Sequence, residues 1–158
     1  MVRVHDELLK AQKLPPSLVT SRIWEERFED IRNFERYLTR NGTVVRKFFL
    51  HVSKDEQKKR FLERLDNPDK NWKFSANDAR ERGFWDKYME AYEDSIRETA
   101  TNDAPWYVVP ADHKWFTRVI VAAAVIDALA SLDLHYPEVS PAKKDELFAA
   151  REALLNEK

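Results

Sequence analysis

The sequence predicts an α/β fold that is rich in helix and has few strands, all of them parallel. Two apolar segments, "TVVRKFFLHV" (43–52) and "WYVVP" (106–110), are rich in β-branched and aromatic residues, which is typical of buried strands. About fifty residues of largely helical pattern separate them, and such connections join parallel strands in right-handed βαβ units. "VRV" (2–4) is a candidate third strand.

The helices that flank the first strand have clear signals. An amphipathic helix that ends at Asn41-Gly42 is predicted by apolar residues three or four positions apart. These residues are Trp24, Phe28, Ile31, Phe34 and Leu38. After the strand, Ser53 to Glu56 has the form of a capping box and opens a helix through Leu65, which Asn67-Pro68 stops.

Three further helices are predicted, each from a cap and an apolar face. Ser75 opens a helix with Trp85, Tyr88, Tyr92 and Ile96 on one face. Asp112 caps a helix whose apolar residues are expected to face a core, namely Phe116, Val119, Ile120, Ala123 and Ile126. Ser140-Pro141 opens the last helix, because proline suits the first helical turn.

The composition limits the possible classes of function. The formal net charge is −1 and there is no cysteine, so we expect no global attraction for nucleic acid, no disulfides and no thiolate metal site. The longest apolar run, 119–126, is too short to span a bilayer, and the N-terminus has no apolar signal core. We therefore expect a cytoplasmic protein. Two glycines, Gly42 and Gly83, cannot form a glycine-rich phosphate loop.

The stretch "DKNWKFSANDARERGFWDKY" (69–88) intermixes five aromatic and five basic residues. In one interpretation, Trp85 and Tyr88 are core residues and the charges form a solvated face. In the other, the basic side chains close over a polyanion, because one guanidinium group can donate to two phosphate oxygens at the same time. Over 46–88, twelve Lys and Arg accompany eight Asp and Glu, so positive charge is concentrated here. Composition leaves both interpretations open.

Other polar residues lie at the predicted carboxyl ends of the strands. Lys114 and Arg118, one helical turn apart after strand 106–110, are expected to face the same crevice as the basic stretch. His51 ends strand 43–52, at the edge where ligands of α/β proteins gather. The four histidines are otherwise spread singly, without the spacing of a metal site, so we predict no metal ligand in this chain.

Several long motifs, in one order, resemble a known family. They are "VRVH", "FFLHVSKDEQ", "NPDKNWKF", "ERGFWDKY" and "APWYVVPADHKW". Over about residues 2 to 137 the chain is similar to the family-2 polyphosphate kinases. The resemblance implies part of a three-layer P-loop-kinase-like domain over 1–137 with a helical lid at about 54–97, and a C-terminal helix at 138–158. It also implies phosphoryl transfer between inorganic polyphosphate and nucleoside mono- or diphosphates, with Mg²⁺ as cofactor.

The resemblance and the charge pattern together select site residues. They are Arg80, Arg82 and Asp86 as catalytic candidates of the lid, and Lys70, Lys73, Lys114 and Arg118 as phosphate or nucleotide ligands. Asp78 and Asp86 either polarise the acceptor or hold basic side chains in place. The implied partners are polyphosphate, AMP, ADP or ATP, and a second copy or a complete kinase subunit. We expect no membrane and no nucleic-acid partner.

The chain also departs from the family pattern. The family's glycine-rich Walker A loop and its Walker B segment are expected upstream of "VRVH", so the sequence predicts the carboxyl-terminal part of such a kinase, inactive by itself. A non-catalytic partner that binds polyphosphate or nucleotide, or regulates a complete kinase, is the first alternative. A nucleic-acid-binding module that uses the basic, aromatic stretch is the second, and the near-neutral net charge counts against it.

Overall fold

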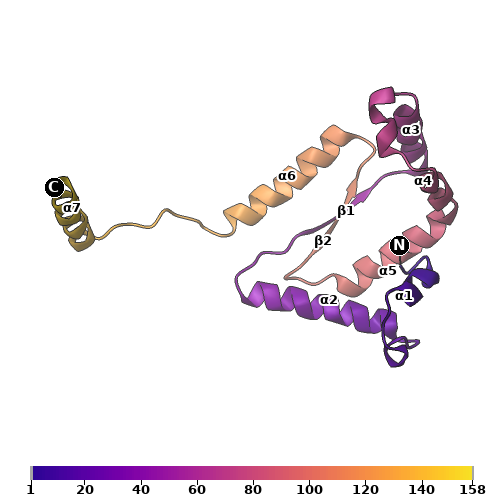
Figure 1. The fold of residues 1–158 in the computed structure, drawn as a ribbon, viewed down its shortest axis with the longest axis horizontal. Coiled ribbons are helices and arrows are strands. Elements are labelled where there is room, and N and C mark those ends of the chain that lie inside the picture. Colours follow the sequence, from indigo (N-terminus) through magenta and orange to yellow (C-terminus); the bar gives the residue numbers. More distant parts are fainter. Residues whose placement is uncertain (1, 158) are drawn as a thin grey trace. The chain divides into compact units, whose positions relative to one another are not determined.

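The computed structural model describes residues 2–157 and is helix-rich α/β, as predicted. The helices and strands are α1 (Asp6–Ala11), α2 (Ile23–Arg40), β1 (Lys47–His51), α3 (Lys54–Leu65), α4 (Ala76–Glu81), α5 (Trp85–Thr99), β2 (Trp106–Pro110), α6 (Lys114–Ala130) and α7 (Pro141–Leu155) (Figure 1). Short 3-10 segments are Pro16–Leu18, Pro68–Lys73 and Arg82–Phe84. One compact unit runs to Val125 and a second begins at Ile126. The expected domain division at 137/138 stays a prediction.

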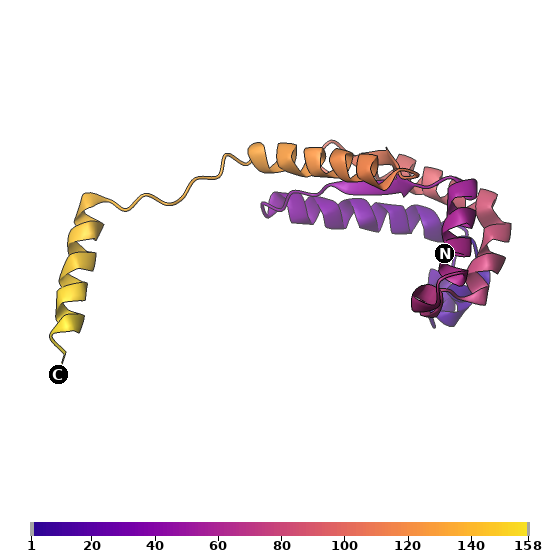
Figure 2. The same ribbon diagram turned by 90° about the horizontal axis from the view of Figure 1, so that it is seen from above.

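The two predicted strands pair in parallel, which confirms the βαβ expectation. The register runs from Lys47 opposite Trp106 to His51 opposite Pro110. The first strand is shorter than the predicted 43–52, because β2 offers only five residues as partners. The Lys47 N–H donates to the Pro105 carbonyl at 3.0 Å, and the ladder begins there. In both ribbon views the strands lie between α2 and the first part of α6 (Figures 1 and 2).

The apolar faces are less buried than the sequence predicts. Leu50 and Val108 of the sheet are 49% and 58% exposed, and only Val109 is almost fully buried among the strand residues. Phe34 of α2 and Val119 of α6, both predicted to face a core, are 62% and 56% exposed. A parallel sheet normally has both faces covered by helices. The two strands described here form too narrow a sheet to cover the apolar faces of α2 and α6.

The predicted capping signals begin their helices. The Ser53 hydroxyl accepts from the Glu56 N–H at 3.1 Å and starts α3, but the reciprocal bond of the predicted capping box is not formed, because the Ser53 N–H donates to Asp112. Ser75 and Asp78 form a reciprocal capping box at the start of α4, and Ser140 caps α7. The single helix predicted from residue 76 is instead divided into α4, a 3-10 turn and α5. Gly83 lies in that turn, and glycine is among the poorest helix formers.

The N-terminal segment does not form a third strand. Residues 2–4 are in a turn, and Arg3 pairs with Asp94 of α5. The Arg3 guanidinium also lies over the rings of Trp24 and Phe28 of α2, at 5.9 and 5.3 Å from their centroids. Because this side chain is held between α2 and α5, the segment packs against helices rather than beside β1.

Within residues 2–157, no helix is both long enough and apolar enough to cross a membrane.

Candidate functional site

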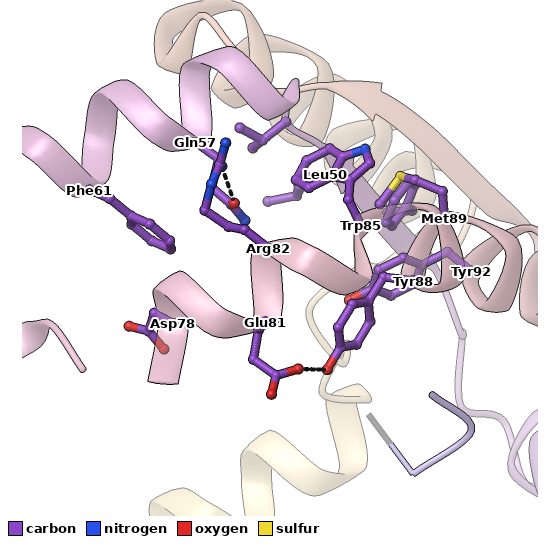
Figure 3. A pocket seen from close by; sticks show the side chains of 12 residues that line it. Leu50, Gln57, Phe61, Asp78, Glu81, Arg82, Trp85, Tyr88, Met89 and Tyr92 are labelled. Carbon is purple, nitrogen blue, oxygen red and sulfur yellow. Dashed lines mark hydrogen bonds between the residues drawn. The ribbon is translucent and has the colours of Figure 1, made fainter. Parts of the chain in front are cut away.

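A cavity of about 340 Å³ lies among β1, α3, α4 and α5 (Figure 3). Most of its wall is apolar or aromatic and includes Phe61 and Trp85. Its polar lining residues are Gln57, Asp78, Glu81 and Arg82. An apolar hollow with a few convergent polar groups is the usual form of a ligand site. It is our candidate functional site.

Arg82 is held at the cavity wall by the first turns of α3. Its Nη1 donates to the Gln57 side-chain oxygen at 2.6 Å, as drawn in Figure 3, and to the Lys54 carbonyl at 3.0 Å. Within residues 2–157, Nε and Nη2 of Arg82 make no hydrogen bond. The guanidinium is thus fixed by one nitrogen, and its other N–H groups remain available to a ligand.

A second polar group at the cavity joins α4, α5 and the N-terminal segment. The Tyr88 hydroxyl donates to Oε2 of Glu81 at 2.6 Å, and the His5 Nε2 lies 2.8 Å from the same oxygen. The His5 ring packs edge-on against Phe84, with centroids 4.7 Å apart. These contacts fix the angle between α4 and α5, and therefore the position of Arg82 between them.

The same contacts shift two pKa values. The hydrogen bond from Tyr88, and then that from His5, lowers the pKa of Glu81, because both favour the charged carboxylate. Burial, followed by the bond to Glu81, raises the pKa of Tyr88 to about 12. At neutral pH the pair is therefore a carboxylate that accepts from a neutral phenol.

A third group joins the carboxyl ends of the two strands. The Asp112 carboxylate accepts from the Ser53 N–H at 2.7 Å, which lowers the pKa of Asp112. Asp112 was predicted to cap α6, but this bond directs it to the start of α3 instead. Arg60 donates to the carbonyls of Ala111 and Asp112, at 2.8 and 3.0 Å, and to Glu56 at 2.8 Å. The first turns of α3 are thus attached to the segment after β2.

The structure brings two of the site candidates named from the sequence to the cavity. Arg82 and Asp78 line it, and Asp78 also belongs to the α4 capping box. The remaining candidates of the sequence are exposed and do not line it: Arg80, Asp86, Lys70, Lys73, Lys114 and Arg118. Lys73 lies over the Trp72 ring at 5.0 Å. Roles in phosphate binding stay predictions for all of these residues.

The sequence did not single out Gln57, Glu81 and Tyr88 as functional residues, although Tyr88 was placed on an apolar helix face. Gln57 could have been noticed, because it directly follows the Ser53–Glu56 segment that begins the helix after the first strand. Glu81 and Tyr88 are seven residues apart, and no local pattern indicates that they form a hydrogen bond.

His51 lies at the end of β1, where the sequence placed it. It lines an adjoining, more apolar hollow of about 470 Å³ together with Val108, and this hollow shares Phe49, Met89 and Tyr92 with the candidate cavity. The His51 carbonyl accepts from the Ala111 N–H at 2.8 Å. His51 therefore does not join the cavity that Arg82 lines.

The described part of the chain holds no cluster of three or more His, Asp or Glu side chains that could bind a metal ion. Its residues therefore do not fit a protein-built metal site.

Comparison with known proteins gives a consistent result. The family model described as polyphosphate kinase 2 matches residues 16–137. An ADP-polyphosphate phosphotransferase of Rhodopseudomonas palustris is 49% identical over 156 residues, which are 98% of this chain and 54% of that protein. A protein of Leptolyngbya boryana, described as "Uncharacterized protein in chlN 3'region", is 56% identical over 135 residues, which are 85% of this chain and 99% of that protein.

A solved structure shares the fold. The crystal structure of polyphosphate kinase 2 from Arthrobacter aurescens matches with a TM-score of 0.79 and 39% identity, over 95% of this chain and 50% of that one. The chain thus spans about half the length of this kinase and of the Rhodopseudomonas enzyme. The family model covers most of the chain, and the fold agrees with it. The chain belongs to the polyphosphate kinase 2 family.

Proposed function

We propose that this chain contributes the lid and two core strands to a phosphotransferase that moves a phosphoryl group between inorganic polyphosphate and a nucleoside mono- or diphosphate. The observation that carries the proposal is Arg82, which is held at the cavity wall while Nε and Nη2 have no protein acceptor in residues 2–157. Membership of the polyphosphate kinase 2 family, and the activity after which the Rhodopseudomonas relative is named, support it.

The chemistry explains why a fixed arginine suits this reaction. In phosphoryl transfer the negative charge spreads over the oxygens of the transferred group, and catalysis is mainly positioning and charge stabilisation. A guanidinium that is already oriented loses little freedom when it binds a phosphate. Arg82 would bind the phosphate at the cavity, and Arg80, Lys70 and Lys73 would attract the chain of phosphates to the exposed side of the lid.

We further propose that this chain does not complete the transfer by itself. Two glycines are too few for the backbone cradle that grips phosphates in P-loop enzymes. The family uses Mg²⁺, and the described residues include no group of three or more His, Asp or Glu side chains that would hold a metal ion by themselves. The proposal therefore assigns this chain phosphate binding and charge stabilisation, and no step runs through a metal.

Polyphosphate binding by the purified chain tests this function. R80A/R82A should weaken binding at least about tenfold at low salt, because two charge-assisted contacts are lost. The R36A/R40A variant, which removes the same charge from exposed positions of α2, is the matched control and should bind like the parent. Added salt should narrow the difference between R80A/R82A and the parent, because the contacts are between charges. Parent-like binding by R80A/R82A would overturn the proposal.

A further inference from the structure

The hydrogen bonds of Arg82 leave one particular edge of its guanidinium open. Nη1 carries two N–H groups, and it has two acceptors, the Gln57 side-chain oxygen and the Lys54 carbonyl. The remaining donors are on Nε and Nη2, which point from the same edge of the planar group. Such a pair of parallel donors matches two oxygens of one phosphate. The two acceptors on α3 therefore select the orientation in which Arg82 presents a bidentate edge.

The chemical type of the acceptor also matters. An amide oxygen accepts a hydrogen bond without carrying a net charge. A carboxylate at the same position would pair with the guanidinium and compete with a phosphate for its charge. Gln57 thus orients Arg82 and leaves its full positive charge for a ligand.

The first turns of α3, which carry Gln57, are themselves held in place. The Ser53 N–H donates to Asp112, and Arg60 donates to the carbonyls of Ala111 and Asp112. These bonds attach the first turns of α3 to the end of β2. Positioning groups are effective when packing and hydrogen bonds lock them in turn. The location of Gln57, and through it that of Arg82, is therefore set relative to the sheet.

We propose that Gln57 is a positioning residue that holds the Arg82 guanidinium with its Nε–Nη2 edge open for one phosphate group of a polyphosphate. This inference rests on the proposed function, and it adds the residue that sets the geometry of the phosphate contact. Gln57 acts through Arg82 and does not itself touch the phosphate.

A double-mutant cycle with inorganic polyphosphate as the probe tests the inference. Q57M keeps the length of the side chain and removes the acceptor; it should weaken binding about three- to tenfold, the range expected for losing one ordinary hydrogen bond. Q57M/R82A should bind as weakly as R82A, because Gln57 then has nothing to position. Q57E should also bind more weakly than the parent, because it keeps the tether and neutralises the charge.

The outcomes separate the inference from the function on which it rests. If R82A binds polyphosphate like the parent, the proposed function fails, and the inference fails with it. If R82A is weakened but Q57M binds like the parent, or if Q57M causes the same loss in both backgrounds, the function stands and the positioning role is overturned. A purely structural role for Gln57 gives the same loss in both backgrounds. Far-ultraviolet circular dichroism of each variant verifies that it is folded.

Discussion

At the scale of single residues, the hydrogen bond from the Tyr88 hydroxyl to Glu81 is the most specific contact between α4 and α5. It links α4 to α5 at 2.6 Å, on either side of the turn that carries Arg82. His5 adds a contact from the N-terminal segment at 2.8 Å. Because the pKa of Glu81 is lowered, its contribution to stability is present above the carboxyl's unfolded-state pKa and is lost as the pH falls through the lower folded value.

The raised pKa of Tyr88 predicts how the free energy of unfolding changes at alkaline pH. The pKa of Tyr88 is raised to about 12 in the folded chain, whereas the pKa of a tyrosine in an unfolded chain is about 10. Between these values the unfolded chain loses the proton and the folded chain keeps it, so the free energy of unfolding should decrease as the pH rises. Y88F should remove this part of the decrease.

Urea unfolding of the parent and of Y88F at pH 9 and pH 11 measures the effect. Y37F, which removes a hydroxyl from an exposed tyrosine of α2, is the matched control and should follow the parent. An equal decrease for the parent and Y88F would contradict the assignment of the raised pKa to Tyr88.

At the scale of elements, the start of α3 has the central role. Its N-terminal cap, its attachment to the segment after β2 and its two acceptors for Arg82 all lie within its first two turns. Loss of the cap would let the first turn fray, and both acceptors of Arg82 would then become less well defined. The proposed phosphate contact of Arg82 therefore depends on a helix end that is set by residues close together in the sequence.

Replacement of Ser53 tests this dependence. S53A should lower the free energy of unfolding by about 1 kcal/mol, because the Glu56 N–H loses its acceptor. S53G should cost only a few tenths of that amount, since glycine is a tolerated cap. Chemical denaturation of both variants measures the difference. Equal stability of S53A and the parent would show that the cap does not support α3.

At the scale of the whole molecule, exposed apolar side chains accompany a narrow sheet. Val108, Trp115 and Val119 are each more than half exposed, and each strand has one neighbour within the described residues. The start of α3, by contrast, is hydrogen-bonded to the segment after β2. Within the described residues, the apolar side chains of the sheet and of α6 are therefore less covered than the polar contacts around α3.

Catalysis is the prediction at this scale. With polyphosphate, ADP and Mg²⁺, the purified chain should form no detectable ATP. A phosphate cradle lowers the activation barrier by positioning the phosphates and by stabilising their charge, and each effect is worth several kcal/mol. Addition of the half of the Rhodopseudomonas enzyme that this chain does not match should restore some activity. A complemented sample with R80A/R82A is the control and should stay inactive. Robust ATP formation by the chain alone would refute this prediction.

Much of the fold follows from short-range patterns in the sequence. Ser53, Ser75 and Ser140 begin their helices as predicted, because capping depends on a few neighbouring residues. The parallel pairing of the two strands follows from the long helical connection between them. The sequence motifs also predicted the family that the comparisons identified.

The tertiary structure decided which side chains meet. Arg80 and Arg82 are the same residue type and lie two positions apart, yet only Arg82 lines the cavity. The 3-10 turn at Arg82–Phe84 redirects the chain between α4 and α5, and this redirection is set by contacts such as Glu81 with Tyr88. The contact between Gln57 and Arg82 likewise joins two residues that are far apart in the sequence. Local periodicity fixes where a helix begins and which residues share a face, whereas the meeting of two helices depends on contacts between residues distant in sequence.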